Sequence, residues 1–239
     1  MSMQALYEMA PQQGAGRIML VMLPGAKALP QDLVQYGFVR ALRERSLLID
    51  VVAVEAHLGY YLEHSLSRHL AHDIIAPARA RNYRRIWFMG ISLGGMGALN
   101  YTREHPADIE GVIMLAPFLG TRGAIAEVVR AGGLARWHPG AIQPDDDEHL
   151  LLAWIKAYQP GSAALPRIYL GYGADDRYAA ASGMLAERLP ATQVVTIPGG
   201  HDWATWIHLW QLLLDQDLFS GAKTAARKRM IVPNKLAIP

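Results

Sequence analysis

The feature that most constrains the fold is a series of short apolar runs separated by longer helix-like stretches. The runs are rich in Val, Ile, Leu and Met, a composition typical of strands buried on both faces of a parallel sheet. They comprise Ile18–Leu23, Ile49–Val54, Ile86–Met89, Val112–Leu115, Ile168–Leu170 and Val194–Ile197. The helix candidates between them are Gln31–Arg45, Tyr60–Ala80, Gly94–Glu104, Ala179–Leu189 and Trp203–Asp217. This alternation predicts an α/β fold, with a mostly parallel twisted sheet covered by helices on both faces.

The interval 121–164 interrupts this alternation, because it contains no convincing strand. Two helix candidates lie in it, Ala124–Arg130 and Glu148–Tyr158, and a proline-rich segment, Trp137–Pro144, separates them. Such an insertion is either a lid over a binding site or ordinary helical cover of the sheet. Its aromatic residues slightly favour the lid, and we expect a small lid-like helical insertion here.

Length and composition favour one domain. The chain has 239 residues, enough to bury a sizeable core, and it contains no cysteine, which excludes disulfides, thiolate metal sites and a cysteine nucleophile. We expect residues 1–220 to form a single domain and residues 221–239 to form a basic C-terminal tail. Five basic residues carry this bias: Lys223, Arg227, Lys228, Arg229 and Lys235. The tail is either solvated or packed on its own domain, or it contacts a partner electrostatically.

Charge and hydropathy limit the partners and the location. The 23 basic and 21 acidic residues give a net charge of +2, which provides no global field for nucleic acid. No apolar run approaches the roughly 18 residues that a membrane span needs. The N-terminal segment has no basic residue before Arg17, so a secretory signal is not expected. These patterns predict a cytoplasmic protein with no nucleic-acid partner and no membrane span.

The strongest chemical motif is Gly90-Ile91-Ser92-Leu93-Gly94, directly between a predicted strand and a predicted helix. A serine on such a sharp turn exposes its hydroxyl, and glycines two positions to either side avoid clashes with the strained backbone. A phosphate-binding loop is an alternative use of these glycines. No Gly-Lys-Ser/Thr follows, however, so the motif favours Ser92 as a nucleophile.

A serine nucleophile needs a base and an acid that orients the base. Among nine histidines, His201 follows the last predicted strand, and the carboxyl ends of parallel strands meet at one edge of the sheet. Asp175 and Asp176 follow the strand before it, and either could orient the imidazole while the other caps the next helix.

Acyl transfer also needs donors for the developing oxyanion and a pocket for the acyl group. The amide of Leu93 can supply one donor, and the loop at Gly25 and Ala26 can supply the second. Four apolar residues are candidates for an acyl pocket, although core packing would explain each of them equally well: Leu119, Trp137, Trp154 and Trp203.

The order serine, aspartate, histidine on these strand ends resembles the α/β-hydrolase superfamily, over about residues 17–219. In that family the acid usually lies three residues after a glycine, and Gly173 then selects Asp176 over Asp175. The resemblance implies that Ser92, Asp176 and His201 hydrolyse a small-molecule ester or thioester through an acyl-enzyme. The segment before the predicted strand Ile18–Leu23 is short, so at most one or two antiparallel edge strands fit there.

The resemblance calls for no metal and no organic cofactor. The pair His69 and His72 could ligate a metal on paper, but this spacing on a long helix is typical of a surface face. One departure concerns the oxyanion loop, where many members have His-Gly and this chain has Leu23-Pro24-Gly25, so the choice between Gly25 and Ala26 stays open. An alternative is a noncatalytic member of the fold that binds a ligand or a partner.

Overall fold

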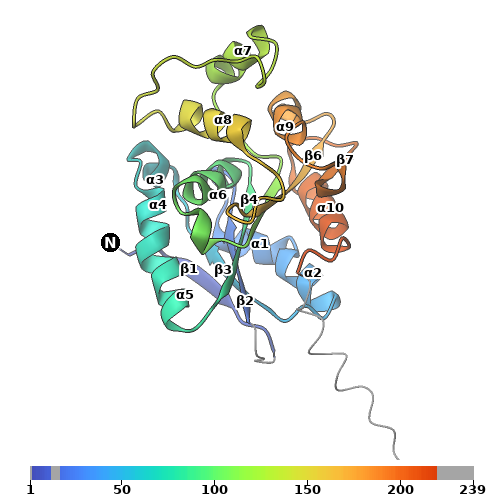
Figure 1. Ribbon diagram of the computed structural model, residues 1–239. Coiled ribbons are helices and arrows are strands. Elements are labelled where there is room, and N and C mark those ends of the chain that lie inside the picture. The colour runs from blue at the N-terminus through green and yellow to red at the C-terminus, as the bar shows by residue number, and fades with distance from the viewer. Residues whose placement is uncertain (1, 12–16, 220–239) are drawn as a thin grey trace, which may run out of the picture.

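A seven-stranded sheet forms the centre of the computed structural model, which describes residues 2–11 and 17–219 (Figure 1). The strand order is β1-β3-β2-β4-β5-β6-β7, and only β1 runs antiparallel to its neighbour. The strands are β1 (Ala5–Glu8), β2 (Ile18–Leu23), β3 (Ile49–Val54), β4 (Arg85–Ile91), β5 (Gly111–Leu115), β6 (Arg167–Gly173) and β7 (Val194–Ile197). The chain therefore has the predicted α/β architecture, with one antiparallel edge strand before β2.

The central strands formed where the apolar runs predicted them, because both of their faces are covered. Every residue of β2, β3 and β5 is buried. The bounds of β2, β3 and β7 coincide with the predicted runs, whereas β4 and β6 extend beyond them at their carboxyl ends. Those extensions matter, because they carry the chain to the edge where the candidate site residues lie.

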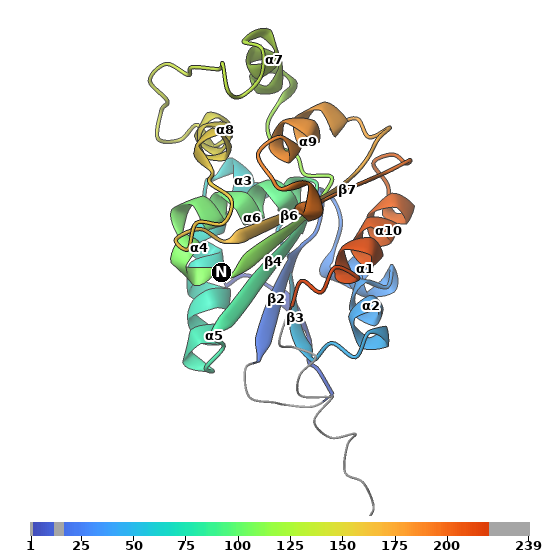
Figure 2. The same ribbon diagram turned by 45° about the vertical axis from the view of Figure 1, so that its right-hand side comes forward.

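Helices cover the two faces of the sheet (Figure 2). One face packs against α1 (Pro30–Gln35), α2 (Phe38–Glu44) and α10 (Trp203–Leu214). The other face is covered by α4 (Leu66–His69), α5 (Ala76–Ala80), α6 (Leu93–Glu104) and α9 (Ala179–Ala186), and its apolar cluster continues into α7 (Arg122–Arg130) and α8 (Asp147–Ala157). Short elements complete the chain: α3 (Leu58–Leu62), a π-helical turn (Leu70–Ile75) and 3-10 turns at Pro106–Asp108 and Ala191–Gln193.

Two predicted helices are interrupted. The stretch 31–45 forms α1 and α2, and Gly37 between them has a φ of 88°, which ends one helix and redirects the chain. The stretch 60–80 forms α3, α4, the π-helical turn and α5, with His64 at a φ of 50° after α3. Apolar periodicity continued across both breaks, so it did not reveal them.

The interval between β5 and β6 holds α7 and α8, close to the two predicted helices. Both helices lie above the carboxyl ends of the parallel strands (Figure 1). The basic residues predicted to form a tail lie outside the described residues. Among the described residues, no helix combines the length and the apolar character that crossing a bilayer requires.

Candidate active site

Ser92 occupies a strained turn between β4 and α6. Its φ of 52° and ψ of −116° are unfavourable for a residue with a side chain. The backbone around it holds this conformation: the Ser92 amide donates to the carbonyl of Leu115 at 3.0 Å, and the Ser92 carbonyl accepts from the amides of Gly95 and Phe118, each at 2.9 Å. The turn is therefore fixed by bonds to β5 and to the loop that follows it.

Glycines make this turn sterically feasible. A Cβ atom added at Gly90 would lie 2.4 Å from the carbonyl oxygen of Gly94. One added at Gly94 would lie 2.2 Å from the carbonyl oxygen of Leu23, at the end of β2. Both distances are far below van der Waals contact, so the motif needs glycine at these two positions to bring the serine between β2 and β5.

His201 and Asp176 form a hydrogen-bonded chain with Ser92. The Nε2 atom of His201 lies 2.9 Å from the Ser92 hydroxyl, and its Nδ1 atom lies 2.8 Å from Oδ2 of Asp176. The Asp176 side chain is fully buried and that of His201 is 8% exposed, so water screens these contacts little. Three side chains that are far apart in sequence thus meet at the carboxyl edge of the sheet.

Other contacts fix the orientation of the acid and the imidazole. The second carboxylate oxygen of Asp176 accepts from the amide of Tyr178 at 2.7 Å. The imidazole of His201 packs edge-on between the rings of Tyr178 and Trp206, each with its centroid at 4.9 Å. These ring contacts and the two hydrogen bonds restrict rotation of the imidazole. One of its nitrogens therefore faces Asp176 and the other faces Ser92.

The neighbouring aspartates have different contacts. Asp175 is exposed, and its carboxylate accepts from the amide of Gly199 at 3.3 Å. Asp202 caps α10 and accepts from the amide of Thr205 at 2.9 Å. The structure thus brings Asp176, rather than Asp175 or Asp202, to the imidazole.

Two predicted oxyanion donors lie beside the serine. Leu93 is the first residue of α6, and the loop after β2 approaches so closely that a Cβ on Gly25 would lie 3.5 Å from Cβ of Ser92. This loop turns back through a hydrogen bond from the amide of Ala28 to the carbonyl of Gly25, at 3.1 Å. Within the described chain the amides of Leu93, Gly25 and Ala26 have no hydrogen-bond acceptor, so the choice between Gly25 and Ala26 as the second donor stays open.

Two cavities meet the candidate site residues. The first has a volume of about 400 Å³ and is lined by Ser92, His201 and the loop at Gly25 and Ala26. The second has a volume of about 530 Å³ and is lined by Leu93, Phe118 and the segment before and at the start of α8. Ser92 and His201 line the first cavity, and the second cavity reaches the candidate site at Leu93.

The predicted acyl-pocket residues are separated by the structure. Trp203 lines the cavity at Ser92 and stacks on Tyr36 at a centroid distance of 4.2 Å. Leu119 and Trp137 are each 1% exposed and pack in the core, so they present no surface to a ligand. Trp154 packs partly buried against the same core, beside Tyr158. Core packing was the alternative explanation for all four predicted residues, and it accounts for Leu119, Trp137 and Trp154.

The sequence analysis missed other residues that line the cavity at Ser92. They include Tyr36, Lys27 and Arg177. Lys27 directly follows Ala26, and Arg177 directly follows Asp176. Their positions next to candidate site residues could therefore have indicated that they lie near the cavity. Tyr36 ends the helix α1, and nothing in its local pattern distinguished it.

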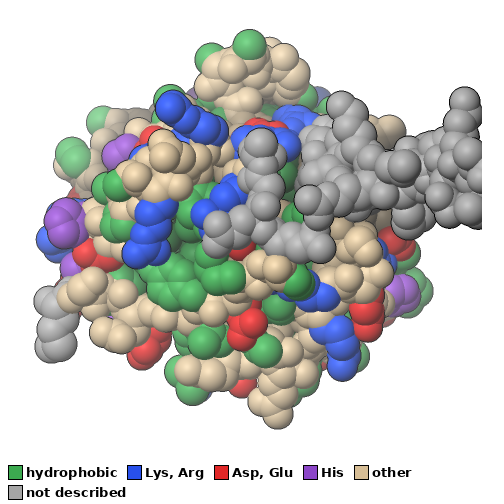
Figure 3. All heavy atoms as spheres, turned by 90° about the horizontal axis from the view of Figure 1, so that it is seen from below, with side chains coloured by type: hydrophobic (Ala, Val, Ile, Leu, Met, Phe, Trp, Pro, Cys, Tyr) green, Lys and Arg blue, Asp and Glu red, His purple; other side chains and the backbone are tan. Residues whose placement is uncertain are grey.

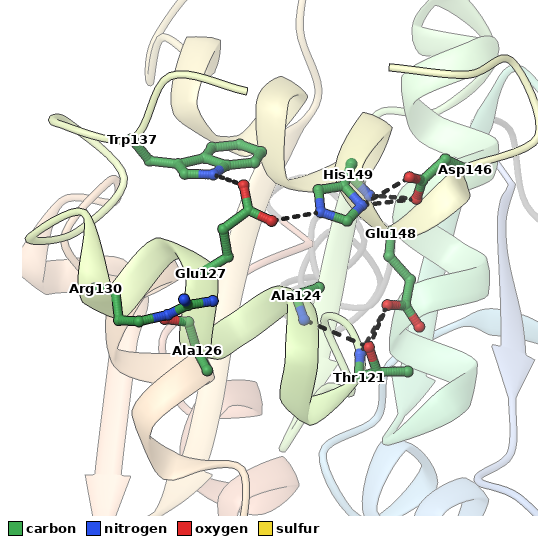
Figure 4. A network of polar contacts seen from close by, with 9 residues as sticks. All are labelled: Thr121, Ala124, Ala126, Glu127, Arg130, Trp137, Asp146, Glu148 and His149. Atoms are coloured by element: carbon green, nitrogen blue, oxygen red, sulfur yellow. Dashed lines mark hydrogen bonds and ion pairs between the residues drawn. The ribbon is translucent and has the colours of Figure 1, made fainter. Parts of the chain in front are cut away.

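A polar network joins α7 to α8 (Figure 4). Glu127 accepts from the Trp137 indole at 2.7 Å and lies 3.1 Å from Nε2 of His149, whose Nδ1 lies 2.9 Å from Asp146. The contact with Asp146, joined by that with Glu127, raises the pKa of His149. The Trp137 and His149 contacts lower the pKa of Glu127, and the His149 contacts lower that of Asp146 against the opposing effect of burial.

The predicted histidine pair is used within the fold. The Nδ1 atoms of His69 and His72 lie 3.0 Å and 2.7 Å from the carboxylate of Asp73, which also accepts from the amide of Met3. Within residues 2–11 and 17–219, no group of three or more His, Asp or Glu side chains is arranged to hold a metal ion.

Comparisons with known proteins agree with this architecture. Residues 68–159, which include Ser92, match the family model described as serine aminopeptidase, S33. No curated protein matches the chain significantly.

Three solved structures illustrate the likeness of fold. A ferulic acid esterase superposes with a TM-score of 0.60 at 15% identity, covering 90% of this chain and 98% of that one. Est1E from Butyrivibrio proteoclasticus gives 0.57 at 17% identity, with 90% and 94% covered. A monoacylglycerol lipase from Paleococcus ferrophilus gives 0.56 at 15% identity, with 90% and 100% covered. With its sheet order and its strand-to-helix serine turn, the chain has the α/β-hydrolase fold.

Proposed function

We propose that the protein is a serine hydrolase that cleaves a carboxylic ester or thioester of a small molecule through an acyl-enzyme on Ser92. The observation that carries this proposal is the continuous chain of hydrogen bonds from Ser92 through His201 to Asp176. A serine hydroxyl is a weak nucleophile until a base removes its proton, and the 2.9 Å contact is within proton-transfer reach.

In the first half-reaction, Oγ of Ser92 attacks the carbonyl carbon while Nε2 of His201 takes the hydroxyl proton. The carbonyl oxygen becomes an oxyanion, which accepts hydrogen bonds from the amide of Leu93 and from that of Gly25 or Ala26. Asp176 holds the imidazole in one tautomer and stabilises the imidazolium. His201 then donates the proton to the departing alcohol or thiol, and the acyl group stays on Ser92.

In the second half-reaction, water takes the place of the departed group. His201 removes a proton from this water as it attacks the acyl carbon, and the same two amides stabilise the second oxyanion. When the bond to Oγ breaks, the imidazolium returns a proton to Ser92 and the carboxylic acid leaves. Residues of the chain supply each proton transfer, so the sequence of steps closes on the starting enzyme.

The similar structures support this class of reaction. One of those neighbours is a ferulic acid esterase and another is a monoacylglycerol lipase, each with this fold at 15% identity. The burial of Asp176 and the restrained imidazole of His201 add support, because a triad works only when its geometry is held in advance.

A fluorophosphonate probe tests the proposal. We expect the wild-type chain to be labelled covalently, and Ser92→Ala to lose labelling and at least about 10³-fold of its esterase activity. Ser182→Ala is the matched control, since Ser182 is also buried but lies on α9 away from the cavity at Ser92. Equal labelling of wild type and Ser92→Ala, or none in a folded wild-type protein, would favour a noncatalytic member of the fold. Aryl acetates and an acetyl thioester then separate ester from thioester preference.

A further inference from the structure

The cavity at Ser92 contains two cations without acidic partners. Lys27 and Arg177 both line it, and neither has a carboxylate within ion-pair distance among the described residues. Basic side chains also lie on the opposite end of the molecule, where the parallel strands begin (Figure 3). An exposed cation alone is therefore unremarkable here, and the position beside the serine is what carries the argument.

Lys27 occupies a conformation that is unfavourable for lysine. It is the third residue of the turn Gly25–Ala28 and has a φ of 67°, a region that favours glycine or asparagine. Such strained residues cluster at functional sites. The preceding residue, Ala26, supplies a candidate oxyanion amide, so the turn holds the lysine close to the reacting carbonyl.

Arg177 is held from the other side of the cavity. It directly follows Asp176, and its guanidinium lies over the ring of Tyr178 at 5.0 Å from the centroid. That ring in turn contacts His201. The arginine thus belongs to the loop that fixes the acid and the imidazole, and a ligand at His201 lies near its charge.

Most of the acidic residues that line the two cavities make contacts within the fold. Asp32 lines the first cavity, but its carboxylate accepts from the amide of Leu29 at the start of α1. In the second cavity, Asp146 contacts His149, and Glu148 accepts from Thr121. Asp147 contacts His64 at 2.8 Å. The Asp32 carboxylate keeps its charge, so Lys27, Arg177 and Asp32 together give the lining of the first cavity a formal net charge of +1.

Reaction chemistry assigns this cavity to one part of the substrate. The leaving group must receive its proton from Nε2 of His201, and His201 lines the first cavity. The second cavity is lined by Leu93, the residue after Ser92, and by Phe118, and we assign the acyl group to that side. The positive charge accordingly faces the alcohol or thiol that departs.

We propose that Lys27 and Arg177 select substrates whose leaving group carries an anionic group, such as a carboxylate or a phosphate. This specificity rests on the proposed serine hydrolase function. The stacked rings of Tyr36 and Trp203 give the same cavity an apolar wall, so a leaving group with both an apolar part and a negative charge fits best.

Three acetyl esters that differ in leaving-group charge test this assignment. They are para-acetoxybenzoate, para-acetoxybenzamide and para-acetoxyphenyltrimethylammonium, and each kcat/KM is divided by the rate of hydrolysis by hydroxide. We expect the wild type to prefer the anionic over the neutral ester by about five- to tenfold at low salt, and less at high salt, because the charges are solvent-exposed.

Variants locate the source of the preference. Lys27→Gln and Arg177→Gln should each lower the ratio of anionic to neutral kcat/KM by about two- to fivefold, and Arg177→Glu should shift preference toward the cationic ester. Arg84→Gln is the matched control: Arg84 is exposed and precedes β4, at the opposite end of the sheet, so the ratio should stay at the wild-type value. Unfolding temperatures show whether each variant is folded.

The outcomes separate the two proposals. Hydrolysis of the neutral ester with no preference for the anionic one overturns the charge selectivity and leaves the serine hydrolase intact. A preference that persists in the Lys27 and Arg177 variants also overturns it. Absence of both hydrolysis and fluorophosphonate labelling overturns the proposed function, and the selectivity with it.

Discussion

At the scale of single residues, the carboxylate of Asp176 has both oxygens assigned. One lies 2.8 Å from Nδ1 of His201 and the other accepts from the amide of Tyr178. In Asp176→Asn, the amide nitrogen would present a donor where the imidazole needs an acceptor, which favours the wrong tautomer. We expect kcat to fall by about 10³- to 10⁴-fold with little change in unfolding temperature, measured with an aryl acetate and by thermal melting.

Asp175→Asn is the matched comparison. The Asp175 carboxylate is exposed and makes one long contact of 3.3 Å to an amide, which an asparagine oxygen can replace. Its kcat should stay within about threefold of the wild type, because the imidazole contact is untouched. A large loss in Asp175→Asn with a small loss in Asp176→Asn would contradict the assignment of the acid.

Local sequence patterns predicted some of the candidate site residues but not others. The turn at Ser92 could be predicted from the sequence because only glycine fits at the positions two residues before and two residues after the serine. Asp175 and Asp176 are equivalent by local pattern, and the resemblance to a family favoured Asp176. Trp137 was misplaced for a physical reason: aromatic character is shared by pocket walls and cores, and burial depends on the packing of α7 on α8.

At the scale of elements, strands were more predictable than helices. A strand such as β2 is buried on both faces, so its whole composition is constrained. In a helix only the buried face is constrained to be apolar, and this apolar pattern can continue where the helix is interrupted. For example, α4, the π-helical turn and α5 share a continuous apolar side although their backbone hydrogen bonding differs. The backbone reversal at His64 depends on tertiary packing, which a single sequence does not encode locally.

The link between α7 and α8 is a pH-dependent element. His149 has a raised pKa in the folded state, so its stabilising contribution is full below the unfolded value of about 6.5 and is lost as pH rises through the folded value. Glu127 and Asp146 have lowered pKa values, so their contribution is present above about pH 4 and is lost as pH falls further. The network therefore stabilises most between about pH 4.5 and 6.5.

His149→Gln measures this contribution. We expect the variant to unfold about 1–3 °C below the wild type near pH 5.5, with the gap closing near pH 8.5, since the groups are partly exposed and the ion pairs are modest. Hydrogen exchange in α7 should accelerate over the same range, because His149 joins this helix to α8. His138→Gln serves as the control, because His138 is exposed and lies in the segment between α7 and α8. A gap that widens toward high pH would contradict the mechanism.

At the scale of the whole molecule, the sheet divides the protein into two apolar layers that meet the site from opposite sides. The α10 layer supplies Trp203 and Trp206 to the cavity at Ser92, and the α6 layer supplies the helix that begins after the serine. Ser92 itself lies at the boundary between the layers. Substrate selectivity can therefore change through the loops at the carboxyl edge without altering either core.

The last described residues pack as part of this framework. Phe219 is 2% exposed, and its ring meets the edge of Trp87, a residue of β4, at a centroid distance of 4.9 Å. Every candidate site residue lies before it in the chain. We therefore propose that residues 1–220 suffice for the folded, reactive domain, and that removing residues 221–239 leaves both fluorophosphonate labelling and the unfolding temperature unchanged within about 1 °C.

Phe219→Ala in the full chain is the contrasting variant. Removing a buried aromatic ring costs about 3–5 kcal/mol, which for a chain of this size lowers the unfolding temperature by about 6–20 °C. The two measurements together place the boundary of the domain: a stable truncated chain and a destabilised Phe219→Ala variant locate it just after the contact with Trp87. If the truncated chain melts as early as Phe219→Ala or loses labelling, residues 221–239 belong to the domain, because they then contribute to the core or to the site.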